Sequence, residues 1–441
     1  MKKTLASVLV FVLVIALLAG CGGTPAAPSA TGEPTAGGSE ASASQPEGEP
    51  TGEAVTVTMM GWYDEPNMEL ILDTLNQELG GEVVVEYTFV NLQQYNNVLS
   101  TQLAAGEGPD ILSDGASFPA RIHAGNLVEI TGADYLSNFN EAGLSLCSVD
   151  GQVYGVPSYG WYSGMWYNKD IFEANNLTPP TTFEELLATC GQLTAAGVTP
   201  LGYGLSDGDT AWGNLAGFLE NVFYHGEGPG TQFDADLAAG RTTMDGNMND
   251  AVNQWKALID NGYINETMLG ISNEQALSDF IAGKTAMFQG GPWQYDTLKE
   301  GGVNFAMLGH LGDNAEERWL CGGPAASYGI NVNSKNQEAA AKVLAAMASQ
   351  AVQQATLDSN KGAFGYFIGL EPDVPEEYAL VMDALTNGRV GCCWDRWGTN
   401  MPAQSMVDEA VKQLQGMVAG TVETEDFLQA MDAKADSIRY E

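Results

Sequence analysis

Aromatic and acidic side chains gather at the ends of segments that the sequence predicts to be strands. Flat aromatic faces suit the C–H faces of a sugar ring, and an ionised carboxylate accepts hydrogen bonds from hydroxyl groups. In open α/β sheets, ligands bind outside the carboxyl ends of the strands. The candidate substrate-binding residues are therefore Trp62, Tyr63, Asp64, Asp114, Tyr159, Trp161, Trp212, Trp293, Trp394, Asp395 and Trp397.

Core packing is the alternative for each tryptophan taken alone. A position in a loop favours ligand binding for Trp62, Trp293 and Trp397, because a loop side chain has less core to fill. Trp166 and Trp255 are expected in the core.

One motif is typical of a hydrolase nucleophile. Gly204–Gly208 (GLSDG) matches the G-x-S-x-G pattern, but the next helix does not follow Ser206 directly and no Asp…His order comes after it. We expect a strand-to-helix loop at a pocket rim and no enzyme. The sequence has no phosphate-cradling glycine motif, and its histidines (His123, His225 and His310) are scattered, so we expect neither cofactor nor metal.

The first residues have the features of a bacterial lipoprotein signal peptide. Lys2 and Lys3 precede an apolar run from Leu5 to Leu18, which is short against the roughly 20 residues of a membrane span. Leu18–Cys21 (LAGC) resembles a lipobox, in which the peptidase cuts before the cysteine and a diacylglycerol is attached to its sulfur. An uncleaved signal anchor is the alternative. We predict a signal peptide at 1–20 and acyl chains, such as palmitate, on Cys21.

The segment after Cys21 has the composition of a tether. Residues 22–54 contain no bulky apolar side chain, so they bury too little surface to offset the entropy of ordering. We expect residues 21–54 to be a lipidated cysteine and a disordered linker that reaches about 30 Å. The protein would then be extracytoplasmic and anchored to the outer face of the bacterial cell membrane.

Charge and cysteine content exclude several classes of protein. The net charge of −39 argues against nucleic acid as a partner, because such binding needs basic surface, and it favours a soluble monomer. Five cysteines besides Cys21 show no metal-ligand spacing, so we expect free buried thiols or a single pair. They are Cys147, Cys190, Cys321, Cys392 and Cys393.

Strands and helices alternate after Val55, which indicates an α/β fold. The periodicity predicts strands at 55–60, 83–89, 153–168, 200–205, 285–289 and 303–308, and residues 109–112 read as a turn that enters a further short strand. It predicts helices at 66–79, 95–103, 183–193, 212–224, 275–281, 337–353, 408–417 and 424–437. Thr181 with Glu184, or Thr182 with Glu185, would form a capping box.

Several stretches carry a family resemblance. They are LAAGEGPDI at 103–111, GNLVEIT at 125–131, YGVP at 154–157, YNKDIF at 167–172 with PTTFEE at 180–185, FIAGKTAM at 280–287 with GPW at 291–293, and GINVNSKN at 329–336. Together they resemble the extracellular solute-binding proteins of carbohydrate ABC importers, the family-1 group that includes maltose-binding protein.

The resemblance implies a type II periplasmic-binding-protein-like fold. Each of two lobes would be a mostly parallel sheet flanked by helices, with the ligand cleft between the lobes and hinge closure on the ligand. Chain crossings near Tyr162, Pro324 and Pro375 would divide the chain. The N-terminal lobe would hold 55–161 plus 325–375, and the C-terminal lobe 162–324 plus 376–441.

The resemblance also implies roles for the candidate residues. Residues 62–64 match a ligand-contacting loop after the first strand, and Asp114 matches a loop that reaches the cleft. Trp161 lies on the hinge-crossing segment, where maltose binders usually carry a carboxylate, so maltodextrin is disfavoured. The expected aromatic shelf of the second lobe consists of Trp212, Trp293, Trp394 and Trp397.

The sequence thus predicts a lipid-anchored protein that captures a sugar or oligosaccharide and delivers it to an ABC-importer permease. One alternative is the same fold with a polyamine or peptide as ligand; iron would need tyrosine or histidine clusters that are missing. A secreted glycoside hydrolase is a further alternative. It needs two carboxylates about 5–10 Å apart, and the sequence shows no such pair with distinct roles.

Overall fold

The part of the chain that the structure describes begins just after the predicted linker. The computed structural model describes residues 54–226, 228–372 and 374–440. The signal peptide predicted at 1–20 and the linker predicted at 21–54 lie outside these residues, except for Ala54. None of the helices in these ranges combines the length and the apolar character that a membrane span needs.

The first of two large sheets contains predicted strands together with one strand, at 327–330, that the sequence analysis did not predict. Its order is β2 (Val83–Phe89), β1 (Val55–Gly61), β3 (Ile111–Asp114), β12 (Ser327–Ile330) and β6 (Val156–Pro157). β2, β1 and β3 are parallel, whereas β12 runs antiparallel to both β3 and β6. The flanking helices are α1 (Glu65–Glu78), α2 (Leu92–Ala104), α3 (Phe118–His123), α12 (Gln337–Met347) and α13 (Gln350–Asp358).

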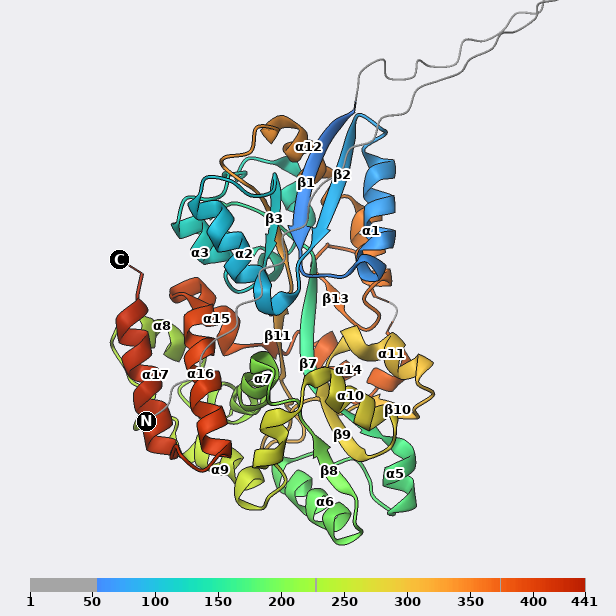
Figure 1. The fold of residues 1–441 in the computed structure, drawn as a ribbon, viewed down its shortest axis with the longest axis vertical. Coiled ribbons are helices and arrows are strands. Elements are labelled where there is room, and N and C mark those ends of the chain that lie inside the picture. The colour runs from blue at the N-terminus through green and yellow to red at the C-terminus, as the bar shows by residue number, and fades with distance from the viewer. Residues whose placement is uncertain (1–53, 227, 373, 441) are drawn as a thin grey trace, which may run out of the picture. The chain divides into compact units, whose positions relative to one another are not determined.

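Successive residues of β1 face opposite sides of this sheet, as the period of two requires. Met59 packs in the cluster that contains Met68 of α1 and Leu344 of α12. Met60 packs in the cluster on the other face, with Leu99 of α2. Figure 1 shows α1 on one side of these strands and α2 with α3 on the other.

The second sheet is built around one long strand, β7 (Tyr159–Asn168). The order is β14 (Val390–Gly391), β11 (Leu320–Pro324), β7, β9 (Thr285–Gly290) and β8 (Thr199–Gly202), and both β10 (Phe305–Met307) and β13 (Phe364–Gly365) also pair with β7. β7 is antiparallel to all four of its partners. In Figure 1, β7 runs from the level of the first sheet down into the second.

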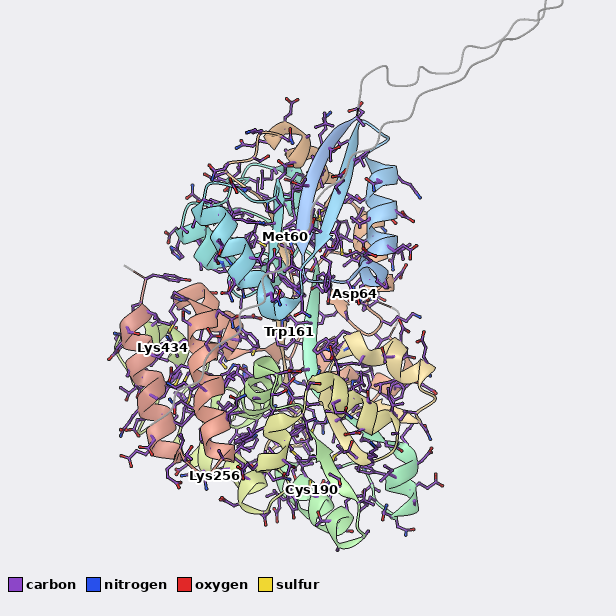
Figure 2. The ribbon with its side chains drawn as sticks, in the orientation of Figure 1. Met60, Asp64, Trp161, Cys190, Lys256 and Lys434 are labelled. Atoms are coloured by element: carbon purple, nitrogen blue, oxygen red, sulfur yellow. The ribbon has the colours of Figure 1, made fainter. Side chains whose placement is uncertain are left out.

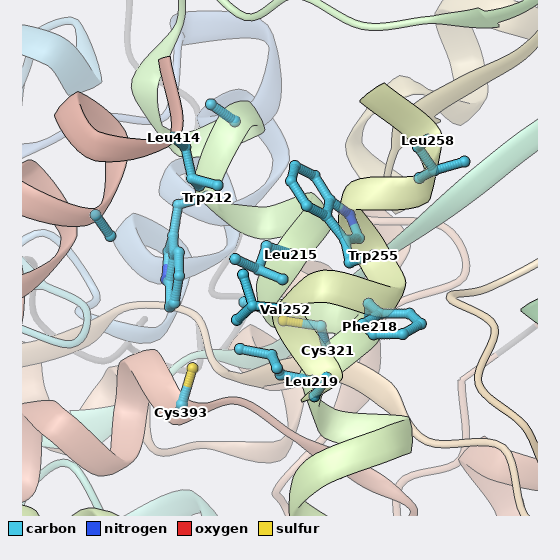
Figure 3. Close-up of a cluster of buried hydrophobic side chains, with 14 of the residues drawn as sticks. Trp212, Leu215, Phe218, Leu219, Val252, Trp255, Leu258, Cys321, Cys393 and Leu414 are labelled. Carbon is cyan, nitrogen blue, oxygen red and sulfur yellow. The ribbon is translucent and has the colours of Figure 1, made fainter. Parts of the chain in front are cut away.

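Helices cover both faces of the second sheet, and two buried clusters result. The helices are α5 (Lys169–Ala174), α6 (Phe183–Ala195), α7 (Gly208–Leu219), α8 (Gln232–Ala238), α9 (Asn249–Asp260), α10 (Asn273–Ile281), α11 (Tyr295–Glu300), α14 (Met382–Thr386), α15 (Cys393–Asn400), α16 (Ala403–Val418) and α17 (Thr424–Ile438). Outside both sheets lie α4 (Glu141–Leu144) and a hairpin of β4 (Ser148–Val149) and β5 (Gln152–Val153). Figure 3 shows part of the larger cluster, in which Trp255 is buried as predicted.

Four expectations about secondary structure need correction. The sheets are mixed rather than mostly parallel, because β12 runs antiparallel to β3 and β11 runs antiparallel to β7. The helix predicted at 337–353 is two helices, since the Ser349 hydroxyl accepts the amide of Val352 and begins α13. The segment 394–397, predicted as a loop, lies in α15. At α6, Thr182 caps the helix, but the Glu185 carboxylate accepts from Thr181 rather than from Thr182.

Candidate functional site

One group of aromatic rings lies where β1 ends and β7 begins. The Trp62 ring centroid is 5.5 Å from that of Tyr63, which is in turn 5.9 Å from that of Tyr159. The backbone carbonyl of Tyr63 accepts the Tyr87 hydroxyl at 2.8 Å, which fixes the loop after β1. Burial, with smaller contributions from Tyr159 and Tyr328, raises the pKa of Tyr63 well above its ordinary value, so the phenol stays neutral.

A second group joins β7, β11 and α15. The Trp161 and Trp394 rings meet edge to face with centroids 6.4 Å apart. Trp161 pairs with Gly323 of β11, and a Cβ on Gly323 would lie 1.7 Å from Oδ2 of Asp395. A glycine at 323 therefore leaves the space that the carboxylate occupies. Figure 2 labels Trp161 in the zone between the two sheets.

Asp395 is the most unusual carboxylate of this group. Its Oδ2 is buried and has no hydrogen-bond partner among the described residues. Burial raises the pKa of Asp395 well above its ordinary value, and the nearby Cys392 adds to this, although Arg396 opposes it. A buried acceptor without a partner costs about 1–3 kcal/mol, so a donor supplied by a ligand would relieve a real penalty.

Both groups of rings rest on the same small cluster. Tyr63 and Trp161 pack against buried Ala325, Leu357 and Ala363, together with Tyr159. The two groups are therefore neighbours. We call the set Trp62, Tyr63, Tyr159, Trp161, Trp394 and Asp395 the candidate site.

Trp293 lies three residues after the end of β9, a strand that pairs with β7. Its ring folds back over Gly291, where an added Cβ would lie 2.2 Å from ring carbon Cζ3 and 2.6 Å from the Tyr162 carbonyl. The turn is held by the Gln294 side chain, which accepts the Gly291 amide at 2.7 Å. Trp293 is 48% exposed, so about half of its side chain is open to solvent.

Two of the predicted acidic residues bind the protein itself. The Asp64 carboxylate caps α1 by accepting the Asn67 amide at 3.2 Å. Asp114, which is 3% exposed, accepts Arg121 Nε at 2.9 Å and the Gly115 amide at 2.9 Å. Burial raises the pKa of Asp114, and Arg121 opposes that rise. Contact of either carboxylate with a ligand stays a prediction.

Trp212 and Trp397 lie in the core rather than on an open shelf. Their rings stack at 5.1 Å with an interplanar angle of 21°, and they are 2% and 0% exposed. The Trp397 indole donates to Asp234 Oδ1 at 3.0 Å. In this conformation neither ring is open to a ligand, and their role in binding stays a prediction. Trp397 is buried because it points inward from α15 instead of lying in a loop.

The sequence reasoning missed a buried ionic network that holds α15 in place. Arg396 donates to Glu220 at 2.5 Å and to Asp234 at 2.7 Å, and both carboxylates are fully buried. The guanidinium also lies 4.2 Å from the centroid of the Tyr224 ring. Burial raises the pKa of Asp234 to about 6 against the opposing effect of Arg396. Arg396 directly follows Asp395, so this network positions the candidate site.

Glu220 reaches the network from a turn of π-helix, Glu220–Tyr224. Such turns are rare and occur mostly as single-turn bulges, frequently at functional sites, and the sequence pattern did not indicate this one. The sequence did contain one chemical sign of this network. Arg396 stands between Asp395 and Trp397 in a chain with only 17 basic residues.

The hydrolase-like motif is not assembled into a nucleophile site. The Ser206 hydroxyl is 3.3 Å from Asp207, and the other oxygen of Asp207 accepts the Asn273 amide at 2.6 Å. The histidine partners lie elsewhere: His310 contacts Ser163, and His225 contacts Glu220. Residues 203–207 form the loop between β8 and α7, and Gly208 is already the first residue of α7, so the helix begins closer to Ser206 than the sequence indicated.

Comparisons with known proteins agree with this architecture. A binding protein of Brucella abortus is 26% identical over 364 residues, which are 77% of this chain and 82% of that protein. A galactooligosaccharide-binding protein of Bacillus subtilis is 27% identical over 263 residues, which are 56% of this chain and 58% of that protein. A sugar transporter of Bacillus licheniformis, solved with stachyose, has the same fold, with a TM-score of 0.68 at 16% identity, over 86% of this chain and 98% of that one.

A match to a protein-family model identifies the family of the chain. The family model described as bacterial extracellular solute-binding protein covers residues 71–383, which is most of the chain and includes strands of both sheets. Members of this family serve ABC transporters outside the cytoplasm, and they are binding proteins. The two-sheet fold, the clustered aromatic side chains and this match agree that the chain belongs to the bacterial extracellular solute-binding proteins.

Proposed function

We propose that the protein captures a sugar or oligosaccharide at the candidate site and delivers it to the permease of an ABC importer. The observation that carries the proposal is the Asp395 carboxylate near the Trp161 and Trp394 rings, whose buried Oδ2 has no hydrogen-bond partner within the part of the chain that the structure describes. Sugar hydroxyls are donors that such an oxygen can accept, and indole faces suit the C–H faces of a pyranose.

We further propose that the two sheets form the cores of two lobes that close on the ligand. We keep the division at 161/162, 324/325 and 375/376. The boundary at 324/325 falls between β11, which ends at Pro324, and β12, which begins at Ser327, whereas the boundary at 161/162 falls within β7. Residues of the candidate site come from β1, β7 and α15, so closure would bring more of their surface onto a ligand. Trp293, which is half exposed and folds over Gly291, would complete the aromatic surface.

A lipid anchor at Cys21 is part of the proposal. It rests on the lipobox and on the apolar run before it, and it would hold a monomeric receptor near its permease. A Cys21→Ala variant should still bind sugar but be shed or kept as a precursor. If cell fractionation finds the variant still lipid-modified and bound to the membrane, the anchor is assigned wrongly.

An amine is the second candidate ligand. A carboxylate flanked by aromatic rings also suits a cation, and the chain carries a net charge of −39. A thermal-shift screen separates the two. A ligand at 100 times its Kd stabilises the folded state by about 2.7 kcal/mol. We expect raffinose, stachyose or a galacto-oligosaccharide to raise Tm. A rise with spermidine and with no sugar would contradict the sugar proposal.

A further inference from the structure

Three buried cysteines meet beneath the candidate site. Cys321 is on β11, and Cys392 and Cys393 lie where β14 gives way to α15. Each is at most 2% exposed. Sγ of Cys321 is 3.0 Å from Sγ of Cys392, about 1 Å more than a disulfide bond of about 2.0 Å.

The backbone already has the spacing that a disulfide requires. β11 and β14 are parallel neighbours in which Cys321 is opposite Gly391, the residue before Cys392. Neighbouring strands are about 4.8 Å apart and one residue along a strand adds about 3.3 Å, so the Cα atoms of Cys321 and Cys392 are expected roughly 6 Å apart, within the roughly 4.4–6.8 Å that a disulfide spans. A small rotation of the two side chains therefore suffices to join the sulfur atoms.

The other described cysteines have different surroundings. The Cys147 thiol is 3.1 Å from the Ser327 hydroxyl, and Cys190 lies on α6 in the lower part of Figure 2, far from β11. Figure 3 shows Cys321 and Cys393 in one buried cluster. In the described ranges no three His, Cys, Asp or Glu side chains are placed to hold a metal ion, which argues against a metal role for these thiols.

We propose that Cys321 and Cys392 form a disulfide in the exported protein. Extracytoplasmic compartments are oxidising, and the family places this chain there. The oxidant is the disulfide of a thiol–disulfide exchange protein. The Cys392 thiolate attacks that disulfide and forms a mixed disulfide, and one thiol leaves. The Cys321 thiolate then attacks the Cys392 sulfur, so the second thiol leaves with its proton. Two cysteines are oxidised and one disulfide is reduced to two thiols.

The proposed disulfide would join two elements that position residues of the candidate site. β11 pairs with β7 at Trp161 through Gly323, and α15 carries Trp394 and Asp395. A bond from Cys321 to Cys392 ties these two elements directly below Asp395. It would keep the Asp395 carboxylate over Gly323 and the Trp394 ring against Trp161. Because the thiols are buried in the folded protein, the exchange must take place before folding is complete.

The test uses the full chain exported by a bacterial host. The protein is denatured in N-ethylmaleimide without reductant, digested and analysed by tandem mass spectrometry. We expect a crosslinked peptide pair lighter by two hydrogen atoms, with fragments that assign the link to Cys392, and alkylated Cys147, Cys190 and Cys393. Alkylation of all five cysteines, or a link through Cys393, would overturn the proposal. No ligand enters this test, so its failure and that of the proposed function are distinguishable.

A variant experiment checks the same bond independently. The Cys321→Ala/Cys392→Ala double variant should melt several degrees below wild type, and Cys190→Ala reports the cost of losing one lone buried thiol. Reducing the wild type with dithiothreitol should lower its Tm until its advantage over the double variant is no larger than two lone buried thiols account for, whereas the Tm of the double variant should not respond. Equal responses of both proteins to dithiothreitol would contradict the disulfide.

Discussion

The buried network around Arg396 yields the sharpest prediction about stability. Arg396→Met keeps most of the apolar stem but removes the charge that pairs with Glu220 and Asp234. Removing one partner of a buried ion pair costs about 3–5 kcal/mol, because the remaining charge is left unpaired. Here two fully buried carboxylates lose the same partner, and only Glu220 keeps another basic neighbour, His225 at 3.4 Å, so we expect a cost within that range at neutral pH.

The structure also predicts how this cost depends on pH. Without Arg396 the pKa values of Glu220 and Asp234 rise, and the variant can protonate both groups in mild acid. The destabilisation should therefore shrink between about pH 7 and pH 5, because protonation removes the buried charges. Urea unfolding followed by circular dichroism measures the free energy of unfolding at both values.

A matched control separates burial from charge. Arg241 pairs with Asp236 on the surface, where the two side chains are 60% and 36% exposed. Arg241→Met should cost only about 0–1 kcal/mol, as exposed pairs do. If Arg396→Met were as mild as Arg241→Met at neutral pH, the reasoning that this network holds α15 in place would be refuted.

Three further predictions concern the site and the core. Asp395→Asn should leave Tm equal or higher yet weaken sugar binding about 10- to 100-fold by calorimetry, as loss of a charged acceptor does. Because ionised Asp395 is the better acceptor and burial raises its pKa, the affinity of the wild type should rise with pH and that of the variant should not. Equal pH profiles of the two proteins would contradict this. Trp293→Ala should weaken sugar binding by more than about 1 kcal/mol with little change in Tm. Leu380→Ala, which shortens another exposed apolar side chain, should change neither the affinity nor Tm. If Trp293→Ala binds sugar as tightly as the wild type, Trp293 is not part of the site. Burial lowers the pKa of His310 to about 4, so below about pH 6.5 the unfolded chain binds a proton that the folded chain does not. The free energy of unfolding should therefore be full above pH 6.5 and fall by up to about 3 kcal/mol toward pH 4. If urea unfolding of a His310→Gln variant shows the same dependence on pH, His310 is not its cause.

The local elements could be predicted from sequence because their causes are local. The stripe of apolar residues in α1, with Met68 and Leu75 buried, lies on one helix face. β2 occupies Val83–Phe89, as the pattern predicted. Ser349 shows the limit: a serine within an Ala-rich run interrupts the helix through its own hydroxyl, and the apolar pattern continues across it.

Parts of the candidate site that depend on distant pairing could not be predicted. The antiparallel return of β12 beside β3 joins residues more than 200 positions apart. Trp212 and Trp397 stack across a similar distance, so no local pattern distinguished two core rings from two ligand-binding rings. For Asp114 the sequence did hold a local sign that it binds the protein itself. Arg121 follows seven residues later, and the helix α3, which carries Arg121, turns its guanidinium back toward the carboxylate. The space for Asp395 over Gly323 is a tertiary feature.

The central claim is that the chain binds a carbohydrate at the Asp395 site, and isothermal titration calorimetry tests it most directly. Full-length protein is titrated with galactose, raffinose, stachyose and galacto-oligosaccharides, and with spermidine in parallel. The account predicts saturable 1:1 binding of at least one sugar, with a negative heat-capacity change from burial of apolar ring surface, and loss of affinity in Asp395→Asn. No heat with any sugar, together with tight binding of spermidine, would contradict it.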